Sequence, residues 1–370
     1  MPVRLNIVRG FCAIALAAAP LVLPVDAVSA QQRMTLEEGA DYVHPHSGIT
    51  VPATLGGIPR TAATAFAPND LNLGISFDTQ GSAEALSVYI YRVTQGSVPV
   101  WFAQAQRAIE LRPAYANPRL AFSVASFTPN GQPNASGLRA VYDTEGSQFT
   151  STGVAMFALN GWYVKIRASS VTQSAEELRD WMDEAIAELT MPAGTTPEAS
   201  PVEPCPNQLT FPKKKSKDVK KNKGENSAFA SLIGSLVAQA AAAQKEGGET
   251  DPDAPAPEPV IYCKDREVAA GRILYRADAS EDSYLFALSD SGVEMTVAPD
   301  TLGFILSEGK AEKPNYAVKL HLADRDISYR LQDRMPRPER VMQLLDKNQT
   351  VGSTSTWGDN STITIDPDSL

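Results

Sequence analysis

Apolar residues alternate with polar or small residues along 71–77, and the alternation returns over 86–90. A period of two is typical of half-buried strands. Gly81-Ser82 lies in the connection, so the two strands are expected to form a hairpin. Over 98–111 the apolar spacing changes to that of a helix, which Pro113 ends.

The residues that follow continue the same unit with more strands and a second helix. Strands are expected over 120–128, 138–144, 149–159 and 162–168. The last two are joined by Asn160-Gly161, a strong hairpin signal because both residues tolerate positive φ. A helix is expected over 174–190, where Ser174 and Glu177 form a capping box ahead of an apolar stripe. Residues 40–192 are therefore predicted to form an α+β domain, an antiparallel sheet packed by two helices.

Residues 193–259 differ sharply from this unit in composition. Pro, Thr, Glu and Ser dominate the first part, seven lysines fall within 213–223, and an Asp, Pro and Ala run ends at Pro259. Such a stretch buries too little apolar area to offset its chain entropy, so a disordered Pro/Lys/Ala-rich linker is predicted. Apolar positions over 228–243 have helical spacing and predict a short amphipathic helix within the linker.

Residues 260–370 are predicted to form a small β-rich α+β domain. Short apolar runs indicate strands over 272–277, 284–289, 293–297, 302–307, 317–323 and 327–331. Pro338 is placed to open a helix, since the first helical position needs no N–H donor. Residues 361–366 suit a last strand. The whole chain is thus expected to be α+β: a sheet-and-helix unit, a disordered insert and a β-rich unit.

Residues 1–30 have the composition of a cleavable secretory signal peptide. Two arginines give a positive start, an uncharged apolar run fills 11–25, and small residues precede position 31. This order of parts predicts cleavage between Ala30 and Gln31. The protein is therefore expected to be periplasmic or secreted.

A membrane anchor and a lipoprotein signal are the two alternatives to a cleaved signal peptide. An N-terminal membrane anchor would need a longer apolar helix, and Pro20 and Pro24 interrupt the run. A lipoprotein would need Cys12 as the acylated residue, but Phe11 precedes it where a small residue is expected. The cleaved signal peptide is the favoured interpretation.

The net charge indicates which partners the protein can bind, and the cysteine content indicates whether it has a disulfide. Cleavage changes the net charge from −10 to −11, which argues against nucleic-acid binding. Cys205 and Cys263 are the cysteines that remain, and in an oxidising compartment a lone pair most simply forms one disulfide. Free buried thiols or intermolecular bridges are the alternatives. The bridge would close 57 residues as a loop.

His44 and His46 form a His-x-His pair. In a strand, residues at i and i+2 share a face, so both rings could reach one metal ion. Pro45 between them and the lack of a third ligand nearby favour a polar loop instead. The pair is therefore kept only as a weak metal candidate, and no metal or cofactor is expected.

His321 is the other candidate for chemistry. A general base would require a nucleophile and an orienting carboxylate close by in the fold. Asp324 and Asp326 are near in sequence, but nothing specifies a nucleophile, so an exposed strand residue is the favoured interpretation. Ser307 and Lys310 match a Ser-x-x-Lys pattern that is common by chance, without its companion motifs. No catalytic residue is assigned.

The lysine run and the predicted helix together span 213–245. A basic stretch beside an amphipathic helix can contact an anionic membrane surface. The helix is poor in bulky residues, with Ala at 240–243. A solvated linker or a helix that docks on a domain are the alternatives, and weak membrane contact stays among the expectations.

The segment Gly161-Trp162-Tyr163-Val164-Lys165-Ile166-Arg167, which leads into the Ser174 helix, carries a family resemblance. With the order of elements over 71–190, it resembles the PsbP-type α/β sandwich. The resemblance implies an accessory or binding domain rather than an enzyme. It implies no site residues, and it does not extend over 193–370.

These observations favour a non-enzymatic binding or scaffold protein of the cell envelope. The partner would be an unidentified envelope protein or ligand, and not nucleic acid. The alternative is an envelope hydrolase with a site near His321 or the His44 and His46 pair. A histidine within hydrogen-bond reach of a serine or carboxylate inside a cleft, with a pair of donors aimed at the same point, would favour that alternative.

Overall fold

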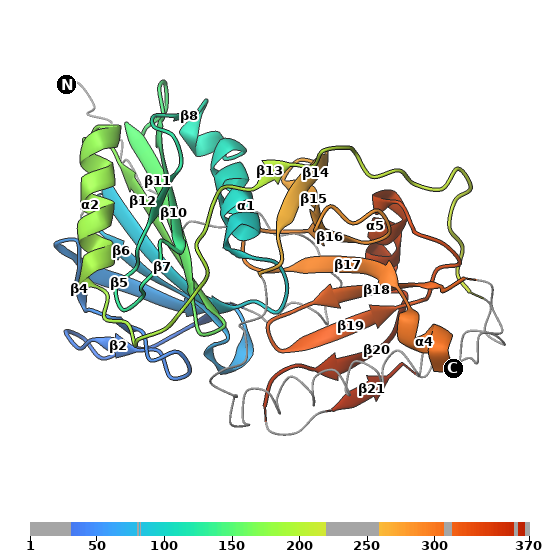
Figure 1. Ribbon diagram of the computed structural model, residues 1–370. Helices are drawn as coiled ribbons and strands as arrows, with labels where there is room; N and C mark the ends of the chain where they lie inside the picture. The colour runs from blue at the N-terminus through green and yellow to red at the C-terminus, as the bar shows by residue number, and fades with distance from the viewer. Residues whose placement is uncertain are drawn as a thin grey trace, which may run out of the picture.

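The computed structural model describes residues 31–79, 81, 83–219, 259–306, 313–358 and 362–366. Two large, mainly antiparallel sheets and few helices make up its regular structure (Figure 1). The α+β class is therefore confirmed only in this coarse form. The predicted leader at 1–30, the Ser307–Lys310 match and the helix expected over 228–243 lie outside the described residues.

The N-terminal sheet is antiparallel throughout. Its strand order is β1 (Gln32–Arg33), β5 (Ile58–Ala65), β6 (Asn72–Asp78), β7 (Glu84–Arg92), β12 (Trp162–Ser170), β11 (Ser151–Leu159), β10 (Gly137–Asp143) and β8 (Arg119–Leu120). β4 (Thr54–Leu55) pairs with β5, and β9 (Ala125–Phe127) with β10. β2 (Tyr42–Val43) and β3 (Thr50–Val51) form a separate pair. The sheet thus begins at Gln32, before the predicted boundary at residue 40.

The hairpin of β11 and β12 confirms the turn prediction. Asn160 and Gly161 have φ values of 48° and 81°, and the strands pair from Leu159 opposite Trp162 to Ser151 opposite Ser170. Both turn residues take the left-handed conformation that a tight hairpin requires. β6 and β7 likewise pair as the alternating pattern predicts.

Helices α1 (Val98–Glu110) and α2 (Ala175–Glu188) pack on opposite faces of this sheet (Figure 1). The predicted capping box of α2 is present: Ser174 Oγ accepts from the Glu177 N–H, and the Glu177 carboxylate accepts from the Ser174 N–H. Leu178, Met182 and Ile186 of α2 are buried against the sheet. The local sequence therefore determines this helix, its start and its buried face.

The C-terminal sheet is a meander with one parallel edge. Its order is β13 (Glu203–Pro204), β14 (Tyr262–Ala269), β15 (Arg272–Ala277), β16 (Tyr284–Ala287), β17 (Glu294–Pro299), β18 (Tyr316–His321), β19 (Arg325–Tyr329), β20 (Thr350–Ser355) and β21 (Ile363–Ile365). Helix α5 (Pro338–Asp346) buries Val341 and Leu344 in the core of this unit. Pro338 begins α5, as predicted.

The strand predicted over 302–307 is wrong. The structure has a short helix there, α4 (Thr301–Leu306). Asp300 explains the difference, since its carboxylate accepts from the Gly303 N–H at the start of the helix. A capping contact of this kind outweighs a short apolar run.

The prediction of a disordered linker over 193–259 is wrong for its first part. Residues 193–219 run along the protein, with Ala199 and Leu209 buried and Val219 N–H donating to Leu331 O. Apolar anchors spaced along the segment supply the burial that its composition does not suggest. The C-terminal unit therefore begins at Glu203 rather than at 260. Residues 220–258 lie outside the described residues.

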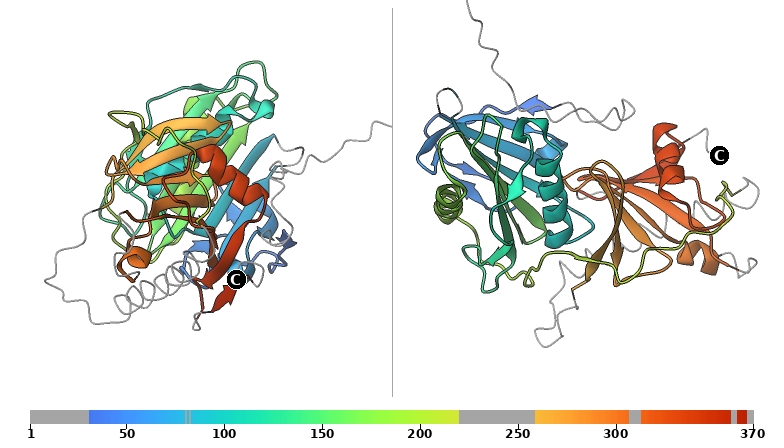
Figure 2. Two further views of the ribbon diagram at one scale, coloured as in Figure 1. Left: turned by 90° about the vertical axis from the view of Figure 1, so that its right-hand side faces the viewer. Right: turned by 90° about the horizontal axis from the view of Figure 1, so that it is seen from above.

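The two sheets meet across the α1 side of the N-terminal sheet (Figure 2). Ile273, Tyr275 and Leu285 of the C-terminal sheet share one apolar cluster with Trp101 and Tyr163 of the N-terminal unit. Ion pairs cross the same junction, among them Lys165 with Asp290 and Arg107 with Glu267. A shared apolar core and these ion pairs hold the two units as one body.

Candidate functional site

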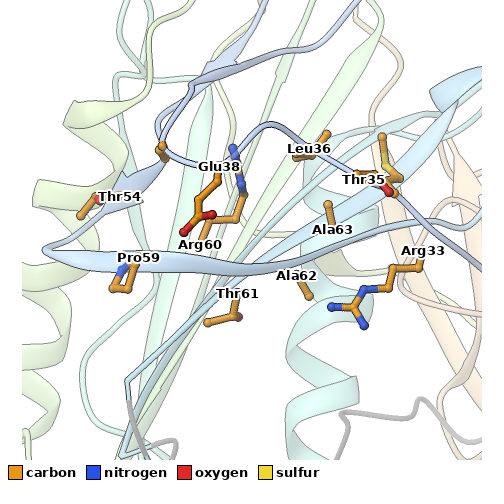
Figure 3. Close-up of a pocket in the computed structure, with 13 residues that line it drawn as sticks. Arg33, Thr35, Leu36, Glu38, Thr54, Pro59, Arg60, Thr61, Ala62 and Ala63 are labelled. Atoms are coloured by element: carbon orange, nitrogen blue, oxygen red, sulfur yellow. The ribbon is translucent and has the colours of Figure 1, made fainter.

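A pocket of about 600 Å³ lies between the N-terminal segment and β5 (Figure 3). It is lined by Arg33, Met34, Thr35, Leu36, Glu38, Gly39, Ala53, Thr54, Pro59, Arg60, Thr61, Ala62 and Ala63. The segment is anchored at both ends of the pocket. Met34 N–H donates to Ala63 O beyond β1, and Arg60 Nη2 donates to Glu37 O nearer the start of β5. The chain therefore crosses over β5 and leaves a hollow beneath it.

Arg60 supplies the hydrogen-bond donors of this pocket. Nη2 donates to the carbonyl oxygen of Glu37, whereas the buried Nη1 has no partner among the described residues. A buried donor without an acceptor costs about 1–3 kcal/mol. Glu38 and Arg33 place one carboxylate and a second guanidinium along the same wall (Figure 3). The pocket can thus take a ligand that carries acceptor groups.

His44 and His46 lie where the two units meet, and their ring nitrogens bind the chain itself. His44 is fully buried; its Nε2 donates to Asp70 O, and Nδ1 lies 2.7 Å from Ser47 Oγ. Burial lowers the His44 pKa, which agrees with a neutral ring. His46 Nε2 donates to Asn69 O. The two rings therefore hold the loop at residues 69–70.

The metal hypothesis for this pair gains no support from these contacts. Both Nε2 atoms are used as donors to carbonyl oxygens, and the His46 ring stacks on Trp162 at 5.7 Å. Within the described ranges, no group of three or more His, Cys, Asp and Glu side chains is arranged to hold a metal ion. His46 also contributes to the contact between the two units, because Trp357 of the C-terminal unit packs on its ring.

His321 is not the exposed strand residue that its sequence position suggested. It is 4% exposed and lies between two partners on one face of the C-terminal sheet. Nδ1 is 2.8 Å from Asp326 Oδ1, and Nε2 is 2.7 Å from Thr296 Oγ1. Adjacent strands β17, β18 and β19 bring the three residues together. The structure thus adds the hydroxyl of Thr296, and of the two aspartates near His321 in sequence it brings Asp326 into contact with the ring.

Glu294 lies opposite His321 in the same sheet. Its side chain is fully buried, and neither carboxyl oxygen has a hydrogen-bond partner among the described residues. Burial, and then the negative charge of Asp326, raise the pKa of Glu294 well above its ordinary value. The neutral, protonated form of this carboxyl is therefore favoured in the folded protein.

Replacement of Glu294 by Gln is expected to raise the free energy of unfolding at pH 7 by up to about 3 kcal/mol. The native state retains a proton that the unfolded chain releases above about pH 4.5, so wild-type stability falls as the pH rises from there. The variant has no such loss. Urea unfolding at pH 5 and pH 8 measures the difference, with the exposed Glu198→Gln as control. An equal pH dependence in variant and wild type would refute the neutral carboxyl.

The disulfide predicted between Cys205 and Cys263 is present, with the two Cα atoms 4.8 Å apart. It joins the chain just after β13 to the start of β14, where Glu203 pairs with Cys263. Free thiols and intermolecular bridges are thereby excluded for this state. Cleavage is predicted between Ala30 and Gln31, and Ala30 lies outside the described residues.

The start of the basic segment is held against the C-terminal unit. Lys217 N–H donates to Asp333, and Asp218 pairs with Arg340 of α5. These contacts anchor residues 217–219, while residues 220–245 lie beyond the described part of the chain. Membrane contact through this segment stays a prediction.

Several of these groups could not be found from the sequence. Arg60 belongs to a strand of small residues, and Thr296 and Glu294 meet His321 only through strand pairing. Lys165 is the group whose position the sequence pattern could have indicated most clearly. It lies between Tyr163 and Arg167 in a period-two pattern, which places three large polar or charged side chains on one sheet face.

The chain matches no family model, no curated protein and no solved structure. The resemblance of residues 71–190 to the PsbP-type sandwich therefore stays an expectation. None of the helices in the described part of the chain is long and apolar enough to cross a bilayer.

Proposed function

We propose that this chain is an exported, non-enzymatic binding protein of the cell envelope, whose ligand occupies the pocket beneath residues 33–39. The observation that carries the proposal is the Arg60 guanidinium in the pocket wall, with one buried nitrogen that lacks an acceptor. A ligand carbonyl or carboxylate would supply that acceptor. Glu38 offers an acceptor in return, so an amino acid or peptide end suits the wall.

The remainder of the protein acts as a rigid scaffold in this proposal. Arg92 of β7 donates to Ala323 O and Thr356 Oγ1 of the C-terminal unit, and its guanidinium lies over the Trp357 ring. Together with the shared core, these contacts oppose a hinge between the units. A binding surface on one unit thus keeps a fixed orientation to the other.

Export is part of the proposal. The disulfide between Cys205 and Cys263 suits an oxidising compartment, and the leader pattern at 1–30 supplies the route. A periplasmic or secreted protein fits both observations.

The binding proposal is tested with a panel of free amino acids and tripeptides, titrated calorimetrically into the disulfide-bonded chain that starts at Gln31. We expect at least one probe to bind and the Arg60→Met variant to bind it about tenfold or more weakly. Arg119→Met is the matched control, because Arg119 is an exposed arginine paired with Glu145 elsewhere. Failure of the whole panel to bind, or equal affinity in the Arg60 variant, would contradict the proposal.

One observation favours a second candidate, an envelope hydrolase. Thr296, His321 and Asp326 have the contacts of a nucleophile, a base and an orienting carboxylate. In such an enzyme His321 Nε2 would take the Thr296 proton while Oγ1 attacks an acyl carbonyl. Release of p-nitrophenol from p-nitrophenyl acetate tests it. Turnover that is lost in Thr296→Val and kept in Thr301→Val would replace the binding proposal with this one.

A further inference from the structure

A basic cluster lies on the α1 side of the N-terminal sheet, away from the pocket. It consists of Lys165 and Arg167 of β12 and Arg112, which follows α1. Lys165 is 4% exposed, and its Nζ donates to Asp290 Oδ2 at 2.8 Å. Arg167 Nη1 is 4.0 Å from the same carboxylate oxygen. Two cations therefore share one carboxylate.

Arg112 adds a third positive charge without a carboxylate. Its guanidinium lies 5.5 Å over the Tyr115 ring and takes part in no ion pair within the described residues. Both Arg112 and Arg167 act electrostatically on the hydroxyls of Tyr89 and Tyr115, which places the two arginines around the same point. The cluster carries surplus positive charge in a chain of net charge −10.

Hydroxyl groups border the two arginines. Tyr115 Oη is 3.0 Å from Ser169 Oγ, which is 2.9 Å from Thr152 Oγ1. Although burial raises the pKa of Tyr115, Arg167 and the bonds to Ser169 and Thr152 outweigh it, so the pKa is lowered. Because Thr152 Oγ1 donates to Ala168 O, the three hydroxyls donate to one another in sequence and hold Tyr115, with Arg112 over its ring, next to β12.

Arg167 also has an unused donor. Its side chain is 15% exposed, and the buried Nη2 has no hydrogen-bond partner among the described residues. Within the described residues, the cluster therefore has more positive than negative charge. One Arg167 guanidinium nitrogen also has no hydrogen-bond acceptor there. An added anion would satisfy both.

We propose that Arg112, Tyr115 and Arg167 form a binding site for the oxyanion group of a small molecule, a carboxylate or a phosphate. Arg167 and Arg112 supply the charge-assisted donors, and the Tyr115 ring holds the Arg112 guanidinium in place. Lys165 and Asp290 fix the position of Arg167 beside them. This site goes beyond the pocket at Arg60 and does not depend on it.

The test is calorimetric titration of the full disulfide-bonded chain with inorganic phosphate and, separately, with succinate at low ionic strength. We expect at least one of them to bind and added salt to weaken the binding. Arg167→Met is expected to weaken it about tenfold or more. Binding of phosphate alone assigns a phosphate group, and binding of succinate alone assigns a carboxylate; either supports the site.

A second variant guards against a folding defect in the first. Arg112→Gln removes a half-buried guanidinium that makes no ion pair in the described part of the chain, and it is expected to weaken binding by a similar factor. Arg119→Gln and the pocket variant Arg60→Met are expected to bind normally, which separates this site from the proposed function. The proposal is overturned if neither anion binds up to about 10 mM. Binding as tight as that of the wild type in both the Arg112 and the Arg167 variant would also overturn it.

Discussion

Replacement of Asp290 by Ala is expected to lower the free energy of unfolding by about 3–5 kcal/mol. The carboxylate is the shared partner of Lys165 and Arg167, and the change leaves a buried lysine at the junction without its ion pair. Burial alone lowers the pKa of Lys165, so an unpaired ammonium there is strongly disfavoured. Urea unfolding of the full chain measures the loss.

Controls separate the charge pair from the shape of the junction. The double variant Lys165→Met/Asp290→Leu is expected to recover most of the stability, because an apolar pair needs no counter-charge. Asp346→Ala, at the exposed last residue of α5, is expected to change the free energy of unfolding by less than about 0.5 kcal/mol. A loss no larger for Asp290→Ala than for Asp346→Ala would show that the pair does not hold the two units.

The pH dependence of the pair has a definite sign. Although burial raises it, the pKa of Asp290 is lowered because the charges of Lys165 and Arg167 outweigh burial. The stabilisation is therefore present above the ordinary aspartate value near 4 and is lost as the pH falls below it. This loss occurs as the pH falls, whereas the loss caused by Glu294 occurs as the pH rises above about 4.5.

Removal of the disulfide in Cys205→Ser/Cys263→Ser is expected to lower the free energy of unfolding by roughly 4 kcal/mol. The bridge closes a loop across a sequence separation of 58, and its loss increases the entropy of the unfolded chain. The parallel pair of β13 and β14 loses its covalent link at the same time. Urea unfolding of variant and wild type measures the difference.

Reduction supplies the matched control for this prediction. Dithiothreitol is expected to bring the wild type to the stability of the serine variant and to leave the variant unchanged. If the reductant has no effect on wild-type unfolding, the bridge either is absent or contributes nothing to the folded state.

Elements with strong local signals could be predicted from the sequence. Ser174 and Glu177 determine the start of α2, and Asn160-Gly161 determines the β11–β12 turn, because each feature depends on neighbours within a few residues. β5 could not be predicted in the same way. Its sequence Ile-Pro-Arg-Thr-Ala-Ala-Thr-Ala has no alternating pattern, and pairing with β6 makes it a strand.

Residues 193–219 show the limit of composition as a guide. The segment is rich in Pro, Thr and Glu, yet Ala199 and Leu209 are buried against distant parts of the chain. The disulfide at Cys205 adds a further constraint. These contacts are non-local, so no window of sequence contains the information that orders the segment.

The candidate sites depend on non-local contacts to a greater degree. His321 could be singled out in the sequence, but Thr296 is 25 positions away and reaches it through the pairing of β17 with β18. Lys165 and Asp290 are 125 positions apart, the first in β12 and the second in the loop between β16 and β17. The sequence indicated which residue types could act, and strand register decided which of them meet.

Intact-mass measurement of the protein isolated from an envelope fraction, without reductant, tests the central proposal of an exported, disulfide-bonded protein most directly. We expect a chain that begins at Gln31 and is lighter by two hydrogens than the dithiol form. No thiol in it should react with alkylating agents. A chain that begins at Met1, or one in which Cys205 and Cys263 both react, would contradict it.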